Sequence, residues 1–232
     1  MIIAIDGPAA SGKGTLAKAV AAHCGLAHLD SGLLYRAVAK SLIDRGCPLE
    51  DEDAATASAA SLDLSKLEAA TLRGAPMGEA ASRIAAYPSV RAALVDLQRS
   101  FACQPGGAVI DGRDIGTVIC PDAEVKLFVT ASAEERARRR WRELVLGGAP
   151  LDYDTVLADI RRRDERDSTR SASPLRQAPD AILIDTTNLD AQAALSAALA
   201  VIAEKKRTRR EPADIAPRGP AKTELPHISE KP

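Results

Sequence analysis

The chain has 232 residues, with 31 Lys or Arg against 32 Asp or Glu, and its formal net charge is −1. Its 46% content of hydrophobic residues and near-zero net charge exclude a fully disordered chain, and the length fits one domain with an addition. Aromatic residues make up only 3%, which argues against nucleic-acid binding through stacked rings.

The cysteines at positions 24, 47, 103 and 120 form no Cys-x-x-Cys pair, and no histidine stands at a zinc-ligand spacing from them. We therefore expect buried free thiols in a reducing compartment rather than disulfides or a zinc site. The first residues turn charged at Asp6, which is too early for a signal peptide, and no apolar run approaches the ~20 residues of a membrane span. The sequence predicts a cytoplasmic protein without a membrane partner.

Short apolar runs alternate with stretches of helical periodicity. Residues 2–5, 108–110, 125–129 and 181–184 predict fully buried strands, and Ala27-His28-Leu29 stands where a further short strand would fall. Residues 16–22, 33–43, 90–101 and 134–146 predict helices. This alternation predicts an α/β fold with a parallel-sheet core and helices on both faces, and a ligand site at the carboxyl ends of the strands.

Two regions break this alternation. Residues 45–80 are rich in Ala and Ser, hold an acidic run at 50–53 and show no convincing strand, so we predict a small helical insertion that covers one side of the sheet. Residues 205–232 contain eight Lys or Arg, four Asp or Glu and five of the fourteen prolines. They predict a disordered, basic and Pro-rich tail, with a nucleic-acid or partner-binding arm at residues 205–210 as the alternative.

A glycine-rich loop follows the first predicted strand. Gly-x-x-x-x-Gly-Lys between a strand and a helix is typical of a phosphate-binding loop, because the glycines allow backbone N–H groups to surround one anion. The following helix adds its positive dipole end, and Lys13 neutralises the β- and γ-phosphates. The alternative is a strand–helix turn without function. The predicted ATP-binding residues are Gly7, Pro8, Ala9, Ala10, Ser11, Gly12, Lys13, Gly14 and Thr15.

A magnesium ion would accompany the triphosphate. Gly14 stands where most such loops carry the magnesium-binding hydroxyl, and Thr15 comes one residue later, so a water-mediated contact is an alternative to direct coordination. Asp111 follows a predicted buried strand and is the second expected metal ligand. Alternatively, Asp111 caps the turn that follows it.

The loop with its following Gly-Thr resembles that of the nucleoside monophosphate kinases. Three further segments resemble the bacterial cytidylate (CMP) kinases: Leu29-Asp30-Ser31-Gly32 with Tyr35-Arg36, the Asp-Gly-Arg-Asp-Ile-Gly-Thr of residues 111–117, and the Arg-Asp-Glu-Arg-Asp-Ser-Thr-Arg of residues 163–170. The resemblance implies a P-loop kinase domain over residues 1–204, with a monophosphate-binding insert at about 45–85 and a mobile lid at about 133–170. Longer members of the family carry extra strands in this insert, and in this chain the short segment of residues 62–72 stands in their place.

The resemblance further implies ATP-dependent phosphorylation of CMP or dCMP with Mg²⁺, by in-line transfer in a monomer that requires no nucleic acid. Lys13, Arg113 and Arg170 are the implied catalytic residues. The implied acceptor contacts are Ser31, Arg36, Arg113 and Arg170 at the phosphate, Tyr35, Arg163 and Asp167 at the ribose, and Ser82, Arg91 and Asp114 at the cytosine. Arg73 also stands at an arginine position of the family.

Arginine is abundant near the predicted lid, with eleven between residues 136 and 176. We expect most of them to be solvated or paired with Glu134, Glu135 and Glu143. No general base is expected, because the acceptor is already an oxyanion, and His23 and His28 are expected to serve packing. One rival function is that of an adenylate, uridylate or shikimate kinase. A second is a nucleotide-dependent switch, but such proteins usually carry an Asn-Lys-x-Asp motif, which is absent from this sequence. The third is nucleic-acid binding by the tail.

Overall fold

A computed structural model of the 232-residue chain describes residues 1–67, 71–72, 75–148 and 151–210. Five parallel strands form one sheet in the order β2-β3-β1-β4-β5. The strands are β1 (Ile2–Asp6), β2 (Ala27–Asp30), β3 (Ala108–Gly112), β4 (Val125–Thr130) and β5 (Ile182–Asp185). The four predicted strands are confirmed, and the short run at 27–29 is the fifth.

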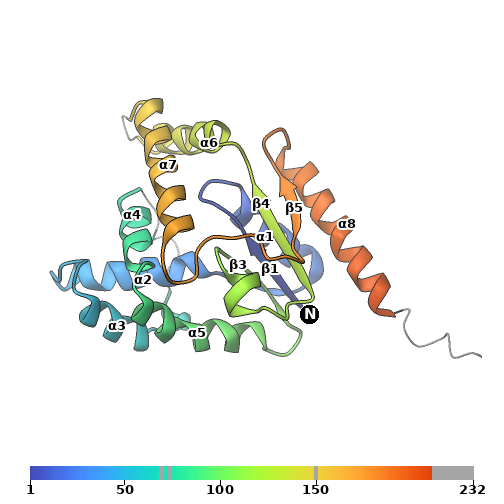
Figure 1. The fold of residues 1–232 in the computed structure, drawn as a ribbon, viewed down its shortest axis with the longest axis horizontal. Coiled ribbons are helices and arrows are strands. Elements are labelled where there is room, and N and C mark those ends of the chain that lie inside the picture. The colour runs from blue at the N-terminus through green and yellow to red at the C-terminus, as the bar shows by residue number, and fades with distance from the viewer. Residues whose placement is uncertain (68–70, 73–74, 149–150, 211–232) are drawn as a thin grey trace, which may run out of the picture.

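Helices cover both faces of the sheet, as the alternation predicts (Figure 1). The helices are α1 (Lys13–Cys24), α2 (Ser31–Asp44), α3 (Glu52–Ala60), η1 (Leu64–Lys66), α4 (Ala75–Ile84), α5 (Pro88–Ala102), η2 (Ile115–Ile119), α6 (Ala133–Leu146), α7 (Tyr153–Thr169) and α8 (Ala191–Arg210). Neighbouring residues of β3 belong to different cores: Val109 packs with α1 and α8, and Ile110 packs with α2 and α5. Both faces of the strand are therefore buried, as a parallel sheet requires.

Strand β5 is a correction to the expectation of fully buried strands. Ile182 and Leu183 are 41% and 52% exposed, and only Ile184 joins the buried cluster of α1 and α8. The reason is position, because β5 pairs with β4 alone and forms the edge of the sheet.

The insertion at 45–80 is helical, and the described residues of this region form no strand. It does not lie directly on the sheet as expected. Helix α3 packs against α2 and α5, and α4 packs against α2, so the insertion adds a further layer outside the helices (Figure 1). The small side chains of Ala55 and Ala59 are buried in this contact, which explains the alanine-rich composition of the segment.

The predicted start of the disordered tail at residue 205 is wrong. Helix α8 continues to Arg210, and Arg207 donates to Glu204 at 2.8 Å within it. The physical reason is that Lys, Arg and Glu are good helix formers and that basic residues favour a helix C-terminus. Residues 211–232 lie outside the described residues.

The cysteines are unpaired, as expected, but they are not uniformly buried: Cys120 is buried, Cys24 and Cys47 are partly buried, and Cys103 is exposed. No helix among the described residues is both long enough and apolar enough to cross a bilayer.

Candidate active site

The phosphate loop lies between β1 and α1 at the carboxyl edge of the sheet. A side chain at position 7 would place its Cβ 2.0 Å from the carbonyl oxygen of Val129, so only glycine lets the loop pass this close to β4. Gly12 is the N-cap of α1 and has a left-handed φ of 85°, which other residues adopt only with strain. Both glycines therefore have the steric roles that the motif predicts.

Side chains donate hydrogen bonds to three carbonyl groups of the loop. The Pro8 carbonyl accepts from Lys13 Nζ at 3.5 Å, the Ala9 carbonyl from Arg136 Nη1 at 3.3 Å, and the Ser11 carbonyl from Thr186 Oγ1 at 3.0 Å. Arg139 reinforces the last contact through hydrogen bonds to both the hydroxyl and the carbonyl of Thr186. The loop carbonyls are thus turned toward protein donors, an orientation that suits N–H groups facing an anion.

Burial lowers the pKa of Lys13 from 10.5 to about 7, with a further lowering by the nearby Arg113. Asp111 and Asp30 oppose this shift. A triphosphate at the loop would oppose it much more strongly, because it adds several negative charges. The charged form of Lys13 is therefore favoured when an anion occupies the loop.

The predicted metal ligands lie together beside α1. A Cβ at Gly14 would be 3.7 Å from Oδ2 of the buried Asp111, so this carboxylate faces the first turn of the helix, where Thr15 is exposed. Oδ1 of Asp111 accepts a hydrogen bond from His28 Nε2 at 2.8 Å, so His28 does more than pack. The described residues contain no group of three or more Asp, Glu, His or Cys side chains placed so that they could hold a metal ion by themselves. One carboxylate and one hydroxyl fit Mg²⁺, which typically takes its remaining ligands from phosphates and water.

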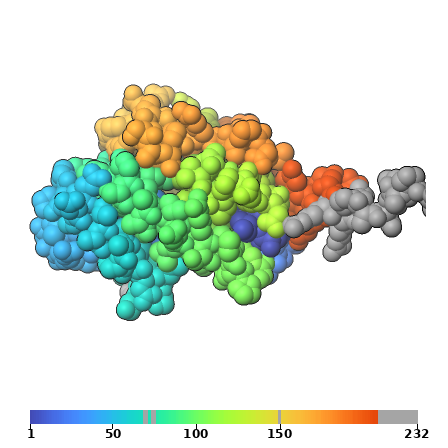
Figure 2. Space-filling model, turned by 60° about the horizontal axis from the view of Figure 1, so that its bottom comes forward, coloured from blue at the N-terminus to red at the C-terminus, as the bar shows by residue number. Residues whose placement is uncertain are grey.

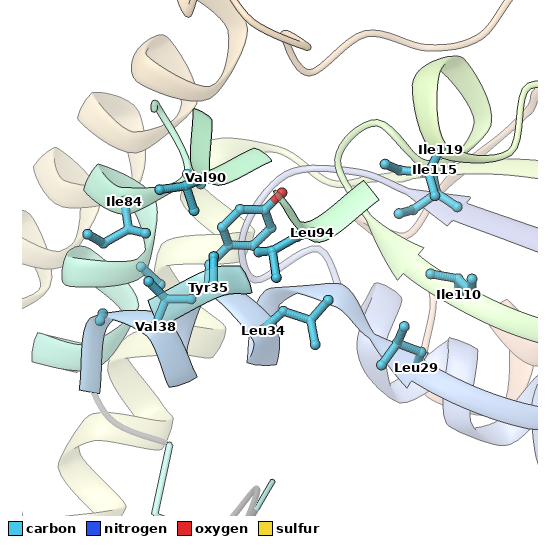
Figure 3. Packing of buried hydrophobic residues seen from close by; sticks show 14 of the residues in the cluster. Leu29, Leu34, Tyr35, Val38, Ile84, Val90, Leu94, Ile110, Ile115 and Ile119 are labelled. Carbon is cyan, nitrogen blue, oxygen red and sulfur yellow. The ribbon is translucent and has the colours of Figure 1, made fainter. Parts of the chain in front are cut away.

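The predicted base-reading residues form a buried cluster. Arg91 Nη2 donates to Asp114 Oδ2, and its Nη1 donates to the Ala85 carbonyl at 3.2 Å. The guanidinium also lies 5.5 Å from the centre of the Tyr35 ring. Figure 3 shows this ring among Val38, Val90 and Leu94, so Tyr35 belongs to the core as well as to the cavity wall.

The residues implied for the ribose and phosphate meet at the end of α7. Arg113 Nε donates to Asp167 Oδ2 at 2.8 Å, and Ser82 Oγ donates to Asp167 Oδ1 at 3.4 Å. Burial would raise the pKa of Asp167, but Arg113 and Arg163 outweigh it and hold the pKa below its ordinary value. In Arg163, burial and the nearby Arg113 lower the pKa to about 10. The Asp167 carboxylate thus offsets the repulsion between the neighbouring guanidinium groups.

Several buried guanidinium N–H groups in this cluster lack a hydrogen-bond partner among the described residues. They are Arg91 Nε, Arg163 Nε and Arg170 Nη2. The Arg170 group comes no closer than 3.8 Å to a carboxylate oxygen of Asp114. Buried donors are almost always paired in folded proteins. Three unpaired donors in one cluster therefore indicate a place for an acceptor-rich ligand.

One cavity of about 700 Å³ joins the two halves of the site. The predicted residues that line it are Ala9, Ala10, Gly12, Lys13, Gly14, Thr15, Ser31, Tyr35, Arg36, Ser82, Arg91, Asp111, Arg113, Asp114, Arg163, Asp167 and Arg170. Gly7, Pro8 and Ser11, which were also predicted to bind ATP, do not line it. Arg73 lies outside the described residues. A hollow of about 540 Å³ between α2 and the insertion contains none of the predicted site residues.

Three arginines of α6 pair with glutamates as expected, although Arg139 also donates to Thr186 and to the Ser11 carbonyl. Arg138 and Arg139 pair with Glu135, and Arg140 pairs with Glu143. Arg136 instead binds Asp164 of α7 through two hydrogen bonds.

Sequence reasoning missed two further groups that support the site. Asp6 accepts hydrogen bonds from the backbone N–H groups of Ile115 and Gly116 at 2.8 and 2.7 Å, and so holds the segment after β3. Thr186 binds the phosphate loop from the end of β5. The position of Asp6, an acidic residue directly before the glycine loop, could have indicated its role. Nothing in the sequence indicated the role of Thr186.

Comparison with known proteins agrees with this geometry. A family model described as cytidylate kinase matches residues 3–204. The cytidylate kinase of Methylocella silvestris is 62% identical over 202 residues, which cover 87% of this chain and 94% of that protein. The cytidylate kinase of Xanthobacter autotrophicus is 60% identical over 209 residues, which cover 90% of this chain and 100% of that protein.

Solved structures support the fold alone. The crystal structure of an uncharacterized protein from Eubacterium ventriosum matches 89% of this chain and 98% of its own, with a TM-score of 0.50 and 17% sequence identity. The family model, by contrast, spans the sheet, the phosphate loop and the arginine cluster in one continuous match. The chain belongs to the cytidylate kinase family.

Proposed function

We propose that the protein transfers the γ-phosphoryl group of ATP to CMP and dCMP and releases ADP with CDP or dCDP. The observation that supports the proposal is the cavity that the phosphate loop shares with Arg91, Arg163 and Arg170, each of which has a buried guanidinium donor without a hydrogen-bond partner among the described residues. A triphosphate on the loop and a monophosphate among the arginines would meet end to end there.

The transfer requires alignment and charge neutralisation more than covalent help. An oxygen of the acceptor phosphate forms the new bond to the γ-phosphorus, and the bond to the bridging oxygen of ADP breaks. Lys13 neutralises the donor phosphates, while Arg113 and Arg170 neutralise the acceptor. Arg36 and Ser31 line the same cavity near the start of α2, where an acceptor phosphate is within reach of the helix N-terminus.

Thr15 and Asp111 are the residues that would hold Mg²⁺. When bound, this ion neutralises charge on the β- and γ-phosphates. His28 fixes one oxygen of Asp111 and leaves the other facing the first turn of α1.

Base selection rests on Asp114, Arg91 and Ser82. Oδ2 of Asp114 is used by Arg91, and Oδ1 is 3.8 Å from the nearest Arg170 nitrogen. Oδ1 can accept a hydrogen bond from the exocyclic amino group of cytosine, which uracil lacks. Asp167 and Arg163 serve the ribose of the acceptor.

The test is an ADP-release assay with CMP, dCMP, UMP, AMP and shikimate as acceptors. We expect CMP and dCMP to be phosphorylated far faster than AMP and shikimate. Equal rates with AMP would overturn the base assignment. The Lys13→Ala variant, purified in parallel, controls for contaminating kinases.

The tail offers the rival function of nucleic-acid binding. We expect a chain cut after Arg210, which keeps all of α8, to retain full turnover and to act as a monomer. If that cut abolished turnover, the tail rather than the cavity would be the functional element.

A further inference from the structure

Arg136 connects three parts of the molecule through one buried side chain. Its Nε donates to the Ala131 carbonyl at 2.8 Å, and its Nη1 donates to the Ala9 carbonyl at 3.3 Å. Nη1 and Nη2 also bind the two oxygens of Asp164 at 2.8 and 2.6 Å. The residue is only 5% exposed, and every nitrogen of the guanidinium has a protein acceptor. Arg136 is therefore not available as an ATP ligand.

One end of this connection is the phosphate loop. Ala9 precedes Ala10, whose φ of 59° is left-handed and unusual for a residue other than glycine. Such a conformation persists only where its surroundings hold it. The hydrogen bond from Arg136 fixes the Ala9 carbonyl, which belongs to the peptide group that enters this strained residue.

The other end is the acceptor side of the site. Asp164 lies on α7 beside Arg163 and three residues before Asp167, both of which line the cavity. The same helix is tied to α4 by Arg166 and Glu79 at 2.8 Å, and Figure 2 shows the end of α7 above the α4–α5 side of the molecule. A shift of Asp164 thus moves the residues that we assign to the acceptor ribose.

We propose that Arg136 is a positioning residue that couples donor and acceptor binding through its pair with Asp164. A triphosphate that fixes the phosphate loop also fixes the Ala9 carbonyl, then Arg136, then Asp164 and α7. The acceptor then binds to a helix already in place, so the two nucleotides favour each other. The inference rests on the proposed function, because it takes α7 as the acceptor-binding helix.

The chain provides a matched control on the same pair of helices. Arg161 of α7 binds Glu134 of α6 at 2.8 Å, but both side chains are more than half exposed and neither contacts the phosphate loop. Arg161→Gln therefore removes an α6–α7 ion pair and leaves the connection to Ala9 intact. Asp164→Asn removes the charge at the connection and keeps the shape of the side chain.

The experiment measures CMP affinity by isothermal titration calorimetry, with and without Mg²⁺ and a non-hydrolysable ATP analogue. In the wild type and in Arg161→Gln we expect the analogue to tighten CMP binding by about 5- to 150-fold. In Asp164→Asn we expect this ratio to fall toward one, with CMP affinity in the absence of the analogue unchanged. The reciprocal titration of the analogue with and without CMP must give the same ratio.

The inference would be overturned by a ratio of one in the wild type, by a full ratio in Asp164→Asn, or by an equal loss of coupling in Arg161→Gln. Weaker CMP binding in Asp164→Asn to the same degree with and without the analogue would also overturn it, because that result indicates support of the acceptor site alone. A wild type that binds no CMP at all would instead refute the proposed function. Arg136→Lys is the second variant, since lysine keeps the charge but cannot span Ala9 and both oxygens of Asp164. If both variants fail to fold, as judged by circular dichroism, the pair is structural only and the inference is wrong.

Discussion

The phosphate loop and the proposed acceptor site would each hold a phosphate group, but they are built differently. The loop between β1 and α1 offers backbone groups and one lysine to the cavity. The acceptor site uses side chains from α2, α4, α5, α7 and the end of β3, and its arginines are kept in place by Asp114 and Asp167. A site made of local backbone groups therefore needs few supporting side chains, whereas a site made of arginines needs carboxylates to keep those cations together.

The two regions also differ in what a substitution removes. In the loop, one side chain carries the charge and the rest is geometry. In the acceptor site, each side chain both binds ligand and holds a neighbour, so truncation changes two things at once. In the acceptor site, substitutions that keep the shape of the side chain therefore separate ligand binding from structural support better than truncations do.

The largest expected effect is at the loop. Lys13→Ala should lower kcat by ~10²–10³-fold, because one preorganised charge at the transferring phosphate is lost. An ADP-release assay measures this loss. Lys40→Ala, which removes a partly exposed lysine of α2 that is paired with Asp44, is the control and should keep wild-type turnover. Near-normal activity of Lys13→Ala would contradict the assigned role of the loop.

A smaller effect is expected at the acceptor site. Asp114→Asn should raise the KM for CMP by ~10–100-fold, the value of hydrogen bonds to a charged group, and leave the KM for ATP unchanged. Alanine at this position would in addition leave the buried Arg91 without its carboxylate, at a cost of about 3–5 kcal/mol in stability.

Steady-state kinetics with each substrate varied in turn separates the two subsites. Asp96→Asn, an exposed carboxylate on α5, is the matched control and should change neither KM. A loss of ATP affinity in Asp114→Asn would mean that Asp114 belongs to the other half of the cavity.

The charge of Lys13 gives the loop a pH dependence. Its pKa is about 7 in the folded protein and 10.5 in an unfolded chain, so the folded state holds fewer protons between these values. The free energy of unfolding of the protein without nucleotide should therefore gain a contribution from Lys13 that increases with pH in this window. ATP binding should reverse the shift and take up a proton, so ATP affinity should decrease above pH 7, by at most about tenfold per pH unit.

Calorimetry of ATP binding in buffers with different ionisation enthalpies measures this proton uptake. Lys13→Met should remove the part that belongs to Lys13. Any remaining uptake can be compared with the titration of Asp6, whose pKa burial raises to about 7. Equal uptake in wild type and Lys13→Met would contradict a displaced lysine pKa.

The smallest expected effect is at Tyr35. Tyr35→Phe keeps the ring beneath Arg91 and removes only the hydroxyl, so we expect the KM for CMP to change by less than ~2-fold and Tm to decrease by about 2–4 °C. Tyr87→Phe, which removes a hydroxyl bonded to the Leu49 carbonyl, is the control for stability alone. A clear rise in KM for Tyr35→Phe but not for Tyr87→Phe would show that the Tyr35 hydroxyl contacts the acceptor.

Features carried by neighbouring residues could be predicted from the sequence. The phosphate loop, the parallel strands and the central parts of α1, α2, α5 and α6 depend on local sterics and on apolar periodicity, and these are visible in short windows. The resemblance supplied the acceptor residues, and the cavity contains every one of them that was predicted. The continuation of α8 to Arg210 was also predictable in principle, because the basic run consists of good helix formers.

The tertiary structure alone decided which charges meet. Arg91 pairs with Asp114, Arg113 with Asp167, and Arg136 with Asp164 and the Ala9 carbonyl, across separations that no periodicity records. It also decided that β5 lies at the exposed edge, since a run of apolar residues is the same in a central strand and in an edge strand. The sequence determined that two phosphates can be bound. The packing of distant segments determined which arginine pairs with which carboxylate in the site. The reason is that the interaction of buried charges depends on their distance in space rather than along the chain.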